Sequence, residues 1–439
     1  MGAFIKKHSA SKIRVIHDLS WPPGSSVNTH IDESLCTLHY STVDDAVNHV
    51  LCYGKGTLMS KLDIKDAYKH IVVDPRDWHL LGLTWPSPTG DTEYYVDLTL
   101  PFGLRSSPYL FEQFASGLQY IMEMKGANDI EHYLDDYFTC GPASTSVCQT
   151  NINIMLETCN ETGFEVNPSK IVLPTTELEY LGIVIDSINM QLKISAHRLH
   201  EIMTELTTWY DKKSCSKRQL LSLIGKLGFI CRVVRSGRTF TRRMIELSKS
   251  AKHLHHKIKL NKSFRDDVLW WLSFLPSWNG VSVIHTETDV ELYTDSSNIG
   301  IGCVYKNVWF TALFTGSKSH LVTKSINWRE LYAIVKAVAT WGHLLCNKKL
   351  LLHCDNESVT YIIKSGTSRD QDIMKLVRIL FYICASYNIE CTCQHIPGLY
   401  NVEADLLSRN KIADYFKFNP NAANVMTLPI DILYDGILI

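Results

Sequence analysis

The stretch DIEHYLDDYFTCG, residues 129–141, places two adjacent carboxylates inside a short apolar segment. Aromatic residues on either side favour β-strand, and a Gly-Pro pair ends the run, so a hairpin is predicted. Burying one unpaired carboxylate is costly, and burying two side by side costs more. Asp135 and Asp136 therefore lie at a solvated turn or meet something positive. Because successive side chains on a strand point to opposite faces, both serve one centre only at or beside a tight turn.

Length and composition indicate an ordinary soluble protein of two or three domains, with 439 residues of which 45% are apolar and 20% charged. No run of about 18 apolar residues occurs, so we expect no transmembrane helix and no membrane partner. The amino terminus lacks the apolar core of a secretory signal. Thirteen cysteines without C-x-x-C spacing argue against a zinc ribbon or disulfide framework. An intracellular location, cytoplasmic or nuclear, is expected.

The formal net charge of −1 hides an uneven distribution of charge along the chain. Residues 212–262 contain fifteen lysines and arginines and a single acid, Glu246. A solvated helical face is one explanation, but such faces usually mix charges of both signs. The excess of cations favours a binding track for a polyanion such as a nucleic acid.

Hydrophobic patterns divide the chain into three regions. Residues 195–276 are mainly helical and contain the basic window. A strand-rich start followed by alternating helix and strand then predicts an α/β domain of about 120 residues. The first region mixes strands and helices, as in an α+β sheet domain. Strands are predicted at 58–64 and 93–100, a strand-turn-strand around 130–140, two short strands near 170–192, and helices at 108–124 and about 144–163.

A third carboxylate is available to the Asp135–Asp136 pair. Asp63 ends the predicted strand 58–64, and three carboxylates from two strands form an oxygen-only set suited to Mg²⁺. Two such ions, roughly 3.5–4 Å apart, activate an attacking hydroxyl and hold a leaving phosphate. These residues therefore predict a two-metal phosphoryl-transfer site.

Four motifs, LDIKDAY, LPFGLRSSPYLFEQ, YLDD and LEYLGIVID, occur in the order of the palm motifs of reverse transcriptases, which the chain resembles. The resemblance implies an α+β right-hand polymerase, with fingers and a palm built on an antiparallel sheet and a helical thumb and connection. It also implies that Asp63, Asp135 and Asp136 are catalytic and bind the metals.

The resemblance assigns nucleotide-binding roles to three further residues. Tyr68, five residues after Asp63, matches the aromatic residue that blocks a 2′-hydroxyl and so selects deoxynucleotides. Phe102 and Gly103 match the loop beneath the nucleotide and the template base. The simpler alternatives are a core tyrosine at position 68 and an ordinary turn glycine at position 103.

Cations near the amino terminus resemble the fingers segment that grips the incoming triphosphate. Arg14 is the strongest candidate because guanidinium binds phosphate bidentately, and Lys7 and Lys12 are further candidates. Lys170 falls where the family has a lysine near the leaving pyrophosphate, and a general acid there needs surroundings that tune its pKa. Solvated surface cations are the alternative for Arg14, Lys7 and Lys12.

A second set of acids follows the basic window. Asp295, Glu330, Asp355 and Asp405 each lie at a predicted strand end or on a predicted helix, and such a set suits two Mg²⁺ and attack of water on a phosphodiester. Their order resembles ribonuclease H. The resemblance implies that all four are catalytic metal ligands, and that His395 lies on a mobile loop and assists proton transfer or product release. Taken singly, each acid is more often a cap or an ion-pair partner.

The helical region corresponds to the thumb and connection, whose cations are expected to contact duplex phosphates without reading sequence. The predicted nucleic-acid-binding residues are Lys217, Arg218, Lys226, Arg232, Arg235, Arg238, Arg242 and Arg243.

The resemblance covers roughly residues 6–410, and phrases such as FGLRSSP and SGRTFTRRMIELS look most like DIRS-type retrotransposons, which encode a tyrosine recombinase. The predicted domains are fingers and palm at 1–190, thumb and connection at 191–285, a ribonuclease H-like domain at 286–412 and a tail at 413–439.

The resemblance implies an RNA-directed DNA polymerase with ribonuclease H activity. Its expected partners are an RNA or DNA template with primer, an RNA–DNA hybrid and dNTPs, and its cofactor is Mg²⁺, two ions per active site, with Mn²⁺ as an alternative. Two other functions stay open: a non-catalytic nucleic-acid-binding remnant with short fingers, and a nuclease whose palm is only a scaffold. All seven proposed ligand positions are acids, which favours activity.

Overall fold

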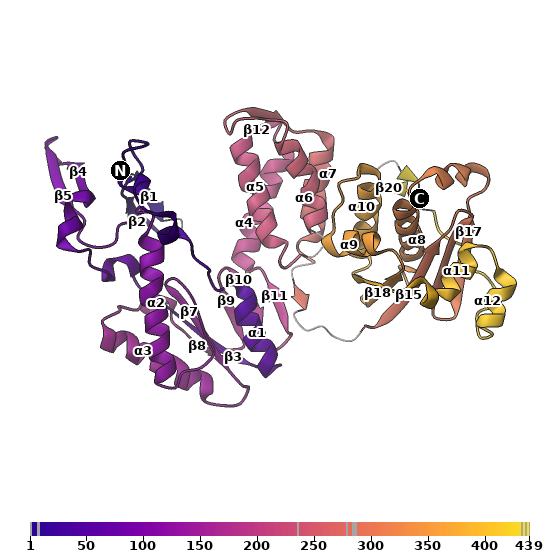
Figure 1. Cartoon of the computed structure of the whole chain (residues 1–439), viewed down its shortest axis with the longest axis horizontal. Helices are drawn as coiled ribbons and strands as arrows, with labels where there is room; N and C mark the ends of the chain where they lie inside the picture. Colours follow the sequence, from indigo (N-terminus) through magenta and orange to yellow (C-terminus); the bar gives the residue numbers. More distant parts are fainter. Residues whose placement is uncertain are drawn as a thin grey trace. The chain divides into compact units, whose positions relative to one another are not determined.

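The computed structural model describes residues 2–6, 9–234, 237–277, 280–282, 288–431, 433–434 and 437–438. They form two compact units, Met1–Ser195 with Ser282–Ile284, and Ala196–Val281 with His285–Ile439 (Figure 1). The predicted domain boundary at 285/286 lies outside the described residues. Within those residues, no helix is both long and apolar enough to cross a membrane.

A four-stranded antiparallel sheet, in the order β6-β7-β3-β8, forms the centre of the first unit. The Tyr137 hydroxyl donates a hydrogen bond to the Ala115 carbonyl of α2 (2.9 Å). The next residue, Phe138, packs on Tyr180 (5.2 Å between ring centroids), so neighbouring side chains cover opposite faces. The elements are α1 (Val43–Tyr53), β3 (Leu58–Asp63), α2 (Ser107–Met124), β6 (Ile130–Tyr133), β7 (Asp136–Gly141), α3 (Val147–Thr162) and β8 (Val172–Thr175).

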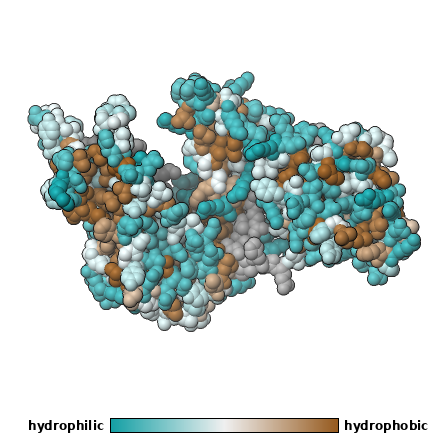
Figure 2. All heavy atoms as spheres, viewed as in Figure 1, coloured by the Kyte–Doolittle hydropathy of each residue, from teal (hydrophilic) through white to brown (hydrophobic). Residues whose placement is uncertain are grey.

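Smaller sheets complete the first unit. The strand predicted at 93–100 ends at Val96, because Thr99 pairs with Val72 in an isolated bridge instead. Figure 2 shows apolar surface in the part that carries β4 and β5, where Val72 and Val96 are exposed. The strands are β1 (Gly2–Lys6), β2 (Ser9–Ile16), β4 (Gly82–Pro86), β5 (Thr92–Val96), β9 (Glu177–Tyr180), β10 (Ile183–Asp186) and β11 (Gln191–Lys193), and β14 (Val281–Ser282) borders β11.

Four helices begin the second unit, as the helical pattern of 195–276 predicted. Ser216 and Gln219 form a reciprocal capping box that starts α5, and the leucine stripe Leu220, Leu223 and Leu227 is buried. A short antiparallel pairing of β12 with β13, two strands separated in sequence by α5 and α6, was not predicted, because three-residue strands leave no periodic signal. The elements are α4 (Ala196–Asp211), β12 (Ser214–Ser216), α5 (Lys217–Ile230), α6 (Gly237–Ser248), β13 (Lys257–Lys259) and α7 (Lys262–Phe274).

A five-stranded mixed sheet, in the order β17-β16-β15-β18-β19, follows in the same unit, with β15, β18 and β19 parallel. Helices cover both faces (Figure 1): Cys303 of β16 donates to the Ala333 carbonyl of α8 (3.6 Å), while Gly302 faces α11. The elements are β15 (Val290–Ser296), β16 (Gly300–Tyr305), β17 (Val308–Leu313), α8 (Ile326–Trp341), β18 (Lys349–Cys354), α9 (Glu357–Ser365), α10 (Gln371–Ser386), β19 (Glu390–His395) and α11 (Val402–Ser408).

The carboxy-terminal segment packs on this sheet rather than standing apart from it. The Trp309 indole donates to the Ala423 carbonyl (2.8 Å), and the fully buried Lys336 of α8 forms an ion pair with Asp431 (2.5 Å). The remaining elements are α12 (Ile412–Phe418), β20 (Leu433–Tyr434) and β21 (Ile437–Leu438).

Gly302 is expected to be essential for the packing of α11 against β16. A Cβ there would lie 2.2 Å from the Ala404 carbonyl oxygen and 2.5 Å from the Ser408 nitrogen, so Gly302→Ala should lower the free energy of unfolding by about 1–3 kcal/mol. Gly225→Ala on α5 is the matched control, since a Cβ there meets nothing within 4 Å, and it should stabilise by about 0.5–1 kcal/mol. Urea unfolding of both variants checks this, and equal effects would contradict it.

Candidate active sites

The first carboxylate set meets at the end of the palm-like sheet. Asp63 and Asp136 are direct partners across β3 and β7. Asp135 lies in the two-residue turn between β6 and β7, where Leu134 has a φ of 55° and the Ile64 amide donates to the Asp135 carbonyl (2.9 Å). The turn explains how neighbouring carboxylates can approach one centre.

The carboxylates at this turn repel one another, and a lysine lies beside them. Burial, followed by repulsion from Asp135 and Asp63, raises the pKa of Asp136 to about 6. The Lys170 ammonium forms an ion pair with Asp63, which is 4% exposed. Burial lowers the pKa of Lys170, but the hydrogen bond and charge of Asp63 outweigh it, so the net pKa lies above the ordinary value. Lys170 therefore holds its proton at neutral pH.

The predicted nucleotide residues of the palm lie together. The ring of Tyr68 is tilted on that of Phe102, with centroids 5.0 Å apart. Gly103 has a φ of 112°, and a Cβ there would lie 1.9 Å from the His17 carbonyl oxygen, so only glycine fits. Pattern reasoning missed Asn28, whose amide donates to the Gly103 carbonyl (2.8 Å) and fixes this loop.

Of the predicted fingers cations, Lys12 and Arg14 lie on β2, which pairs with β1. Lys7 lies outside the described residues. The contribution of these three residues to triphosphate binding stays a prediction.

The second carboxylate set comes together in the second unit. Asp295 lies near the end of β15, Glu330 on the first turn and a half of α8, and Asp355 directly after β18. Ligand atoms of Glu330, Cys354 and Asp355 lie within 4.8 Å of one another, and no other such His, Cys, Asp or Glu trio occurs among the described residues. Cys354 was not predicted; a buried cysteine inside an apolar strand gives no signal of a ligand.

The buried carboxylates of this set repel one another. Burial and then the charges of Asp295 and Asp355 raise the pKa of Glu330 to about 9. Burial raises the pKa of Asp295 to about 6 and also raises that of Asp355. Glu330 accepts a hydrogen bond from the Ser296 amide (3.1 Å). Oxygen donors in excess of their positive partners fit a hard divalent cation.

The remaining members of the set lie beside it. Asp405, on α11, forms an ion pair with Arg409 (2.7 Å) and contributes to the raised pKa of Asp355. His395 is the last residue of β19 instead of a loop residue, because its strand pairs with β18 up to Cys354. Its Nε2 lies 3.1 Å from the Asp355 carbonyl oxygen.

A buried arginine that pattern reasoning did not assign holds the loop after β15. Arg329, 7% exposed, donates to the Ser297 carbonyl and to the Asn298 side chain, both at 2.8 Å. Its position, one residue before Glu330, was the available signal. Arg329 thereby connects the end of β15 to α8, the two elements that carry Asp295 and Glu330.

The predicted basic residues differ in how much of their charge is neutralised. Lys226 forms an ion pair with Glu205 (2.7 Å) and Arg242 with Glu246 (3.0 Å). Arg243 lies 3.7 Å from Asp267, and Lys217 donates to the Ala251 carbonyl (2.8 Å). Arg218, Arg232 and Arg238 are exposed, and Arg235 lies outside the described residues.

Two parts of the chain, each of which contains acids of one of the two carboxylate sets, match known protein families. Residues 5–185 match the family described as reverse transcriptase (RNA-dependent DNA polymerase). Residues 285–383 match the RNase H-like domain found in reverse transcriptase. The first match contains Asp63, Asp135 and Asp136, and the second contains Asp295, Glu330 and Asp355.

The chain is similar in sequence to viral polyproteins. The chain is 24% identical over 374 residues to a polyprotein of Cassava vein mosaic virus (81% of this chain, 53% of that protein). It is 22% identical over 381 residues to polyprotein P3 of Commelina yellow mottle virus (81% and 18%). The chain thus spans about half or less of the length of these relatives.

Among solved structures, a foamy viral protease–reverse transcriptase in complex with double-stranded DNA resembles the chain with a TM-score of 0.52 at 15% identity, over 89% of this chain and 64% of that one. This likeness shows the fold, and with the family matches it confirms the predicted fold class. The chain carries a reverse transcriptase domain followed by an RNase H-like domain. Both are of the kind found in retroelement and viral polyproteins.

Replacing Glu330 by glutamine should stabilise the metal-free protein. Since the pKa of Glu330 is raised from 4.5 to about 9, the folded state binds the extra proton and loses stability as pH rises through that interval. Glu330→Gln should therefore gain little at pH 5 and about 1–3 kcal/mol at pH 8. Thermal unfolding in EDTA measures the difference, with the exposed Glu357→Gln as control. A gain that shrinks with rising pH would contradict the assignment.

Proposed function

We propose that the chain is an RNA-directed DNA polymerase with ribonuclease H activity. The observation that carries the proposal is that acids from separate segments lie near one another in each matched domain: Asp63 opposite Asp136 with Asp135 in the adjoining turn, and Glu330 with Asp295 and Asp355. Each set contains acids whose pKa is raised by burial and by neighbouring carboxylates, which is typical of functional sites.

In the proposed polymerase site, Asp63, Asp135 and Asp136 hold the divalent cations, Mg²⁺ by preference and Mn²⁺ as an alternative. The cations, two per site, supply charge stabilisation for in-line attack of a primer 3′-hydroxyl on the dNTP. Lys170, held protonated by Asp63, is placed to donate to the leaving pyrophosphate. Tyr68 and the Phe102–Gly103 loop form the floor of the nucleotide site.

In the proposed ribonuclease H site, Asp295, Glu330, Asp355 and Asp405 would hold a second pair of cations, which would supply charge stabilisation for attack of water on a phosphodiester. Arg329 fixes the loop beside Asp295. His395, beside the Asp355 carbonyl, is placed to transfer a proton to the product strand.

The proposed substrates are a primed RNA or DNA template, dNTPs and an RNA–DNA hybrid. The basic helices support this, since Arg218, Arg232 and Arg238 expose charge that a phosphate backbone can neutralise. Double-stranded DNA is bound by the foamy viral relative in its solved complex. Phrases such as SGRTFTRRMIELS support a DIRS-type retrotransposon as the source.

The predicted domain limits, 1–190, 191–285, 286–412 and 413–439, are proposed to separate these activities. The compact units support a break near residue 195. The contacts of Trp309 and Lys336 with Ala423 and Asp431 favour treating the tail as part of the nuclease domain.

A nuclease that uses the polymerase domain only as a scaffold is the second candidate. Glu330 and Asp355 belong to the set of ligand atoms within 4.8 Å, whereas Asp63, Asp135 and Asp136 do not form such a set in the described part of the chain. This function predicts cleavage of hybrid RNA without any incorporation of dNTPs.

Two substitutions should separate the activities. Asp135→Asn removes one proposed ligand of the polymerase site and should lower primer extension by about 10³-fold while sparing hybrid cleavage. Glu330→Gln should do the reverse. Extension of a labelled primer on an RNA template, and cleavage of a labelled hybrid, measure both. Loss of both activities in both variants would refute this division of labour, and a parent chain without extension would favour the second candidate.

Tyr68 should control the choice between sugars. Tyr68→Ala opens the space that a 2′-hydroxyl would occupy, so incorporation of ribonucleotides relative to deoxynucleotides should rise about 10- to 100-fold. Tyr68→Phe, which keeps the ring packed on Phe102, is the matched control and should preserve selection. Single-nucleotide extension with dNTP and rNTP gives the ratio. If both variants incorporate rNTP relative to dNTP in the same ratio, Tyr68 does not select the sugar and is a core residue only.

A further inference from the structure

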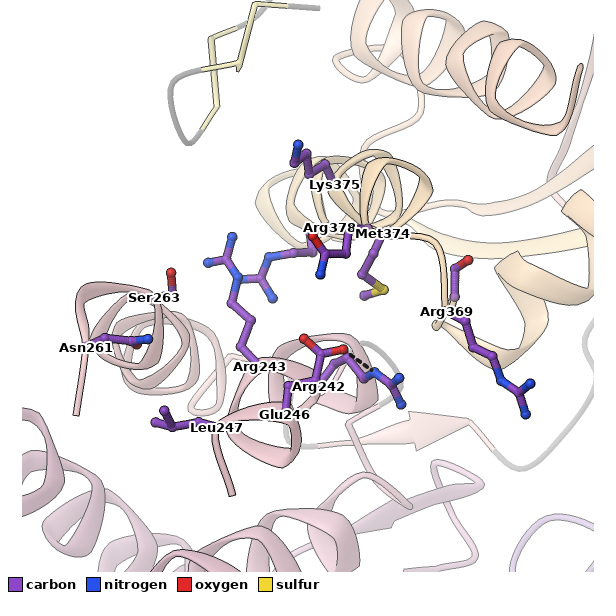
Figure 3. A pocket seen from close by; sticks show the side chains of 12 residues that line it. Arg242, Arg243, Glu246, Leu247, Asn261, Ser263, Arg369, Met374, Lys375 and Arg378 are labelled. Carbon is purple, nitrogen blue, oxygen red and sulfur yellow. Dashed lines mark hydrogen bonds and ion pairs between the residues drawn. The ribbon is translucent and has the colours of Figure 1, made fainter. Parts of the chain in front are cut away.

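A cavity of about 300 Å³ in the second unit is lined by α6, the start of α7, and α10 with the segment that leads into it (Figure 3). Five cationic side chains and one carboxylate contribute to its lining, and no predicted catalytic acid does. The charged lining residues are Arg242, Arg243, Glu246, Arg369, Lys375 and Arg378.

The two walls of the cavity are held together by buried contacts. Arg378 of α10, 3% exposed, forms an ion pair with the fully buried Asp267 of α7. Its Nη1 donates to the Thr239 carbonyl of α6 (3.2 Å), and the Thr239 hydroxyl donates to the Gly366 carbonyl (2.7 Å). The cavity is therefore formed in the folded protein before any ligand arrives.

The carboxylates near the cavity, Asp267 and Glu246, already form ion pairs with arginines. Asp267 contacts both Arg378 and Arg243, the latter at 3.7 Å. Glu246 is paired with Arg242 at 3.0 Å. Arg369 has no ion-pair partner within the described ranges, and the Nε of Arg378 is buried without a hydrogen-bond partner there. Such a group is costly unless an acceptor completes it.

A fifth cation is balanced by a carboxylate outside the cavity. Lys375 pairs with Asp372 (2.8 Å), which also pairs with Lys324 (2.9 Å). Lys375 is half-exposed, and its flexible side chain can reach a second anion. The cavity thus keeps a surplus of positive charge after every ion pair of the described residues is counted.

We propose that this cavity binds a backbone phosphate of the nucleic-acid duplex, with Arg369 and Lys375 from one wall and Arg242 and Arg243 from the other. The inference rests on the proposed function and deepens it, since it adds Arg369, Lys375 and Arg378 to the basic residues of α6. Guanidinium groups in a preformed fork match phosphate oxygens bidentately. Asn261 and Ser263 add polar side chains at the α7 edge.

An anionic phosphodiester fits this lining better than an apolar ligand or a stacked base. The open lining is dominated by charge, and no aromatic ring lines it for base stacking. Contact is therefore expected with the backbone and not with the bases, so the site should bind hybrids irrespective of sequence. Free phosphate carries the same anionic oxygens, and the experiment below distinguishes binding of free phosphate from binding of a backbone phosphate.

The test uses the full chain with the double substitution Arg369→Ser and Lys375→Ser. Both residues are exposed, so the fold should persist, and the buried Arg378 is left unchanged. Fluorescence anisotropy with a labelled RNA–DNA hybrid in EDTA should show affinity about tenfold weaker. The slope of log Kd against log salt should fall by about 1.

Lys417→Ser is the matched control. Lys417 pairs with Asp414 three residues before it (3.0 Å), as Lys375 pairs with Asp372, and it lies on α12 away from the lining residues. This variant should bind the hybrid like the parent chain. Equal affinities and salt slopes for the control and the double variant would overturn the proposal.

Calorimetric titration with inorganic phosphate separates the two sources of anion. If the double variant loses phosphate binding but keeps the affinity of the parent for the hybrid, the cavity is a small-anion site and the proposal fails. Binding is read without turnover, so a chain that lacks polymerase and nuclease activity still tests the cavity. Conversely, an active chain whose hybrid binding ignores the double substitution would refute only the cavity.

Discussion

Repulsion among buried carboxylates is the constraint around which both domains are built. Asp136 faces Asp63 across a ladder of two strands, and Glu330 lies beside Asp295 and Asp355. Each arrangement raises pKa values, to about 6 for Asp136 and about 9 for Glu330. A fold keeps such groups together only when the rest of the structure offsets the cost. Asp63, Asp136, Asp295 and Asp355 lie at or next to strand ends and Asp135 lies in a turn, whereas Glu330 and Asp405 come from helices α8 and α11.

The surrounding residues show how this cost is offset. Lys170 forms an ion pair with Asp63, and Arg329 anchors the loop that follows β15. Gly302 lets the backbone of α11 approach β16 closely, which brings Asp405 to the sheet. Gly103 likewise lets the loop after Leu100 approach the His17 carbonyl closely. Close backbone approach and single charged anchors thus place acids that would otherwise repel one another.

Charged residues of the helical region have two roles, one at the surface and one in a buried ion pair. Its exposed arginines suit a polyanion, while Asp267, fully buried, ties α7 to Arg378 of α10. A buried ion pair of this kind contributes little net stability but fixes the geometry of the elements it joins. The cavity beside it follows from this geometry, because cations of α6 and α10 are brought together with few acids between them. Binding of a phosphate backbone would then be linked to the packing of these helices.

The sequence by itself determined the order of the motifs, the identity of the seven acids, the hairpin around Asp135 and the helical basic region. These features depend on local periodicity and on the chemistry of single residues, both of which are written along the chain. Only the tertiary structure decided that Cys354 lies beside Glu330, that Arg329 anchors a loop, that residues 423–431 pack on the RNase H-like domain, and that Arg369 and Lys375 line the same cavity as Arg242 and Arg243 of α6. Such contacts join segments far apart in the chain, and a lone surface cation or a cysteine in a strand has the same local pattern whether or not a partner meets it.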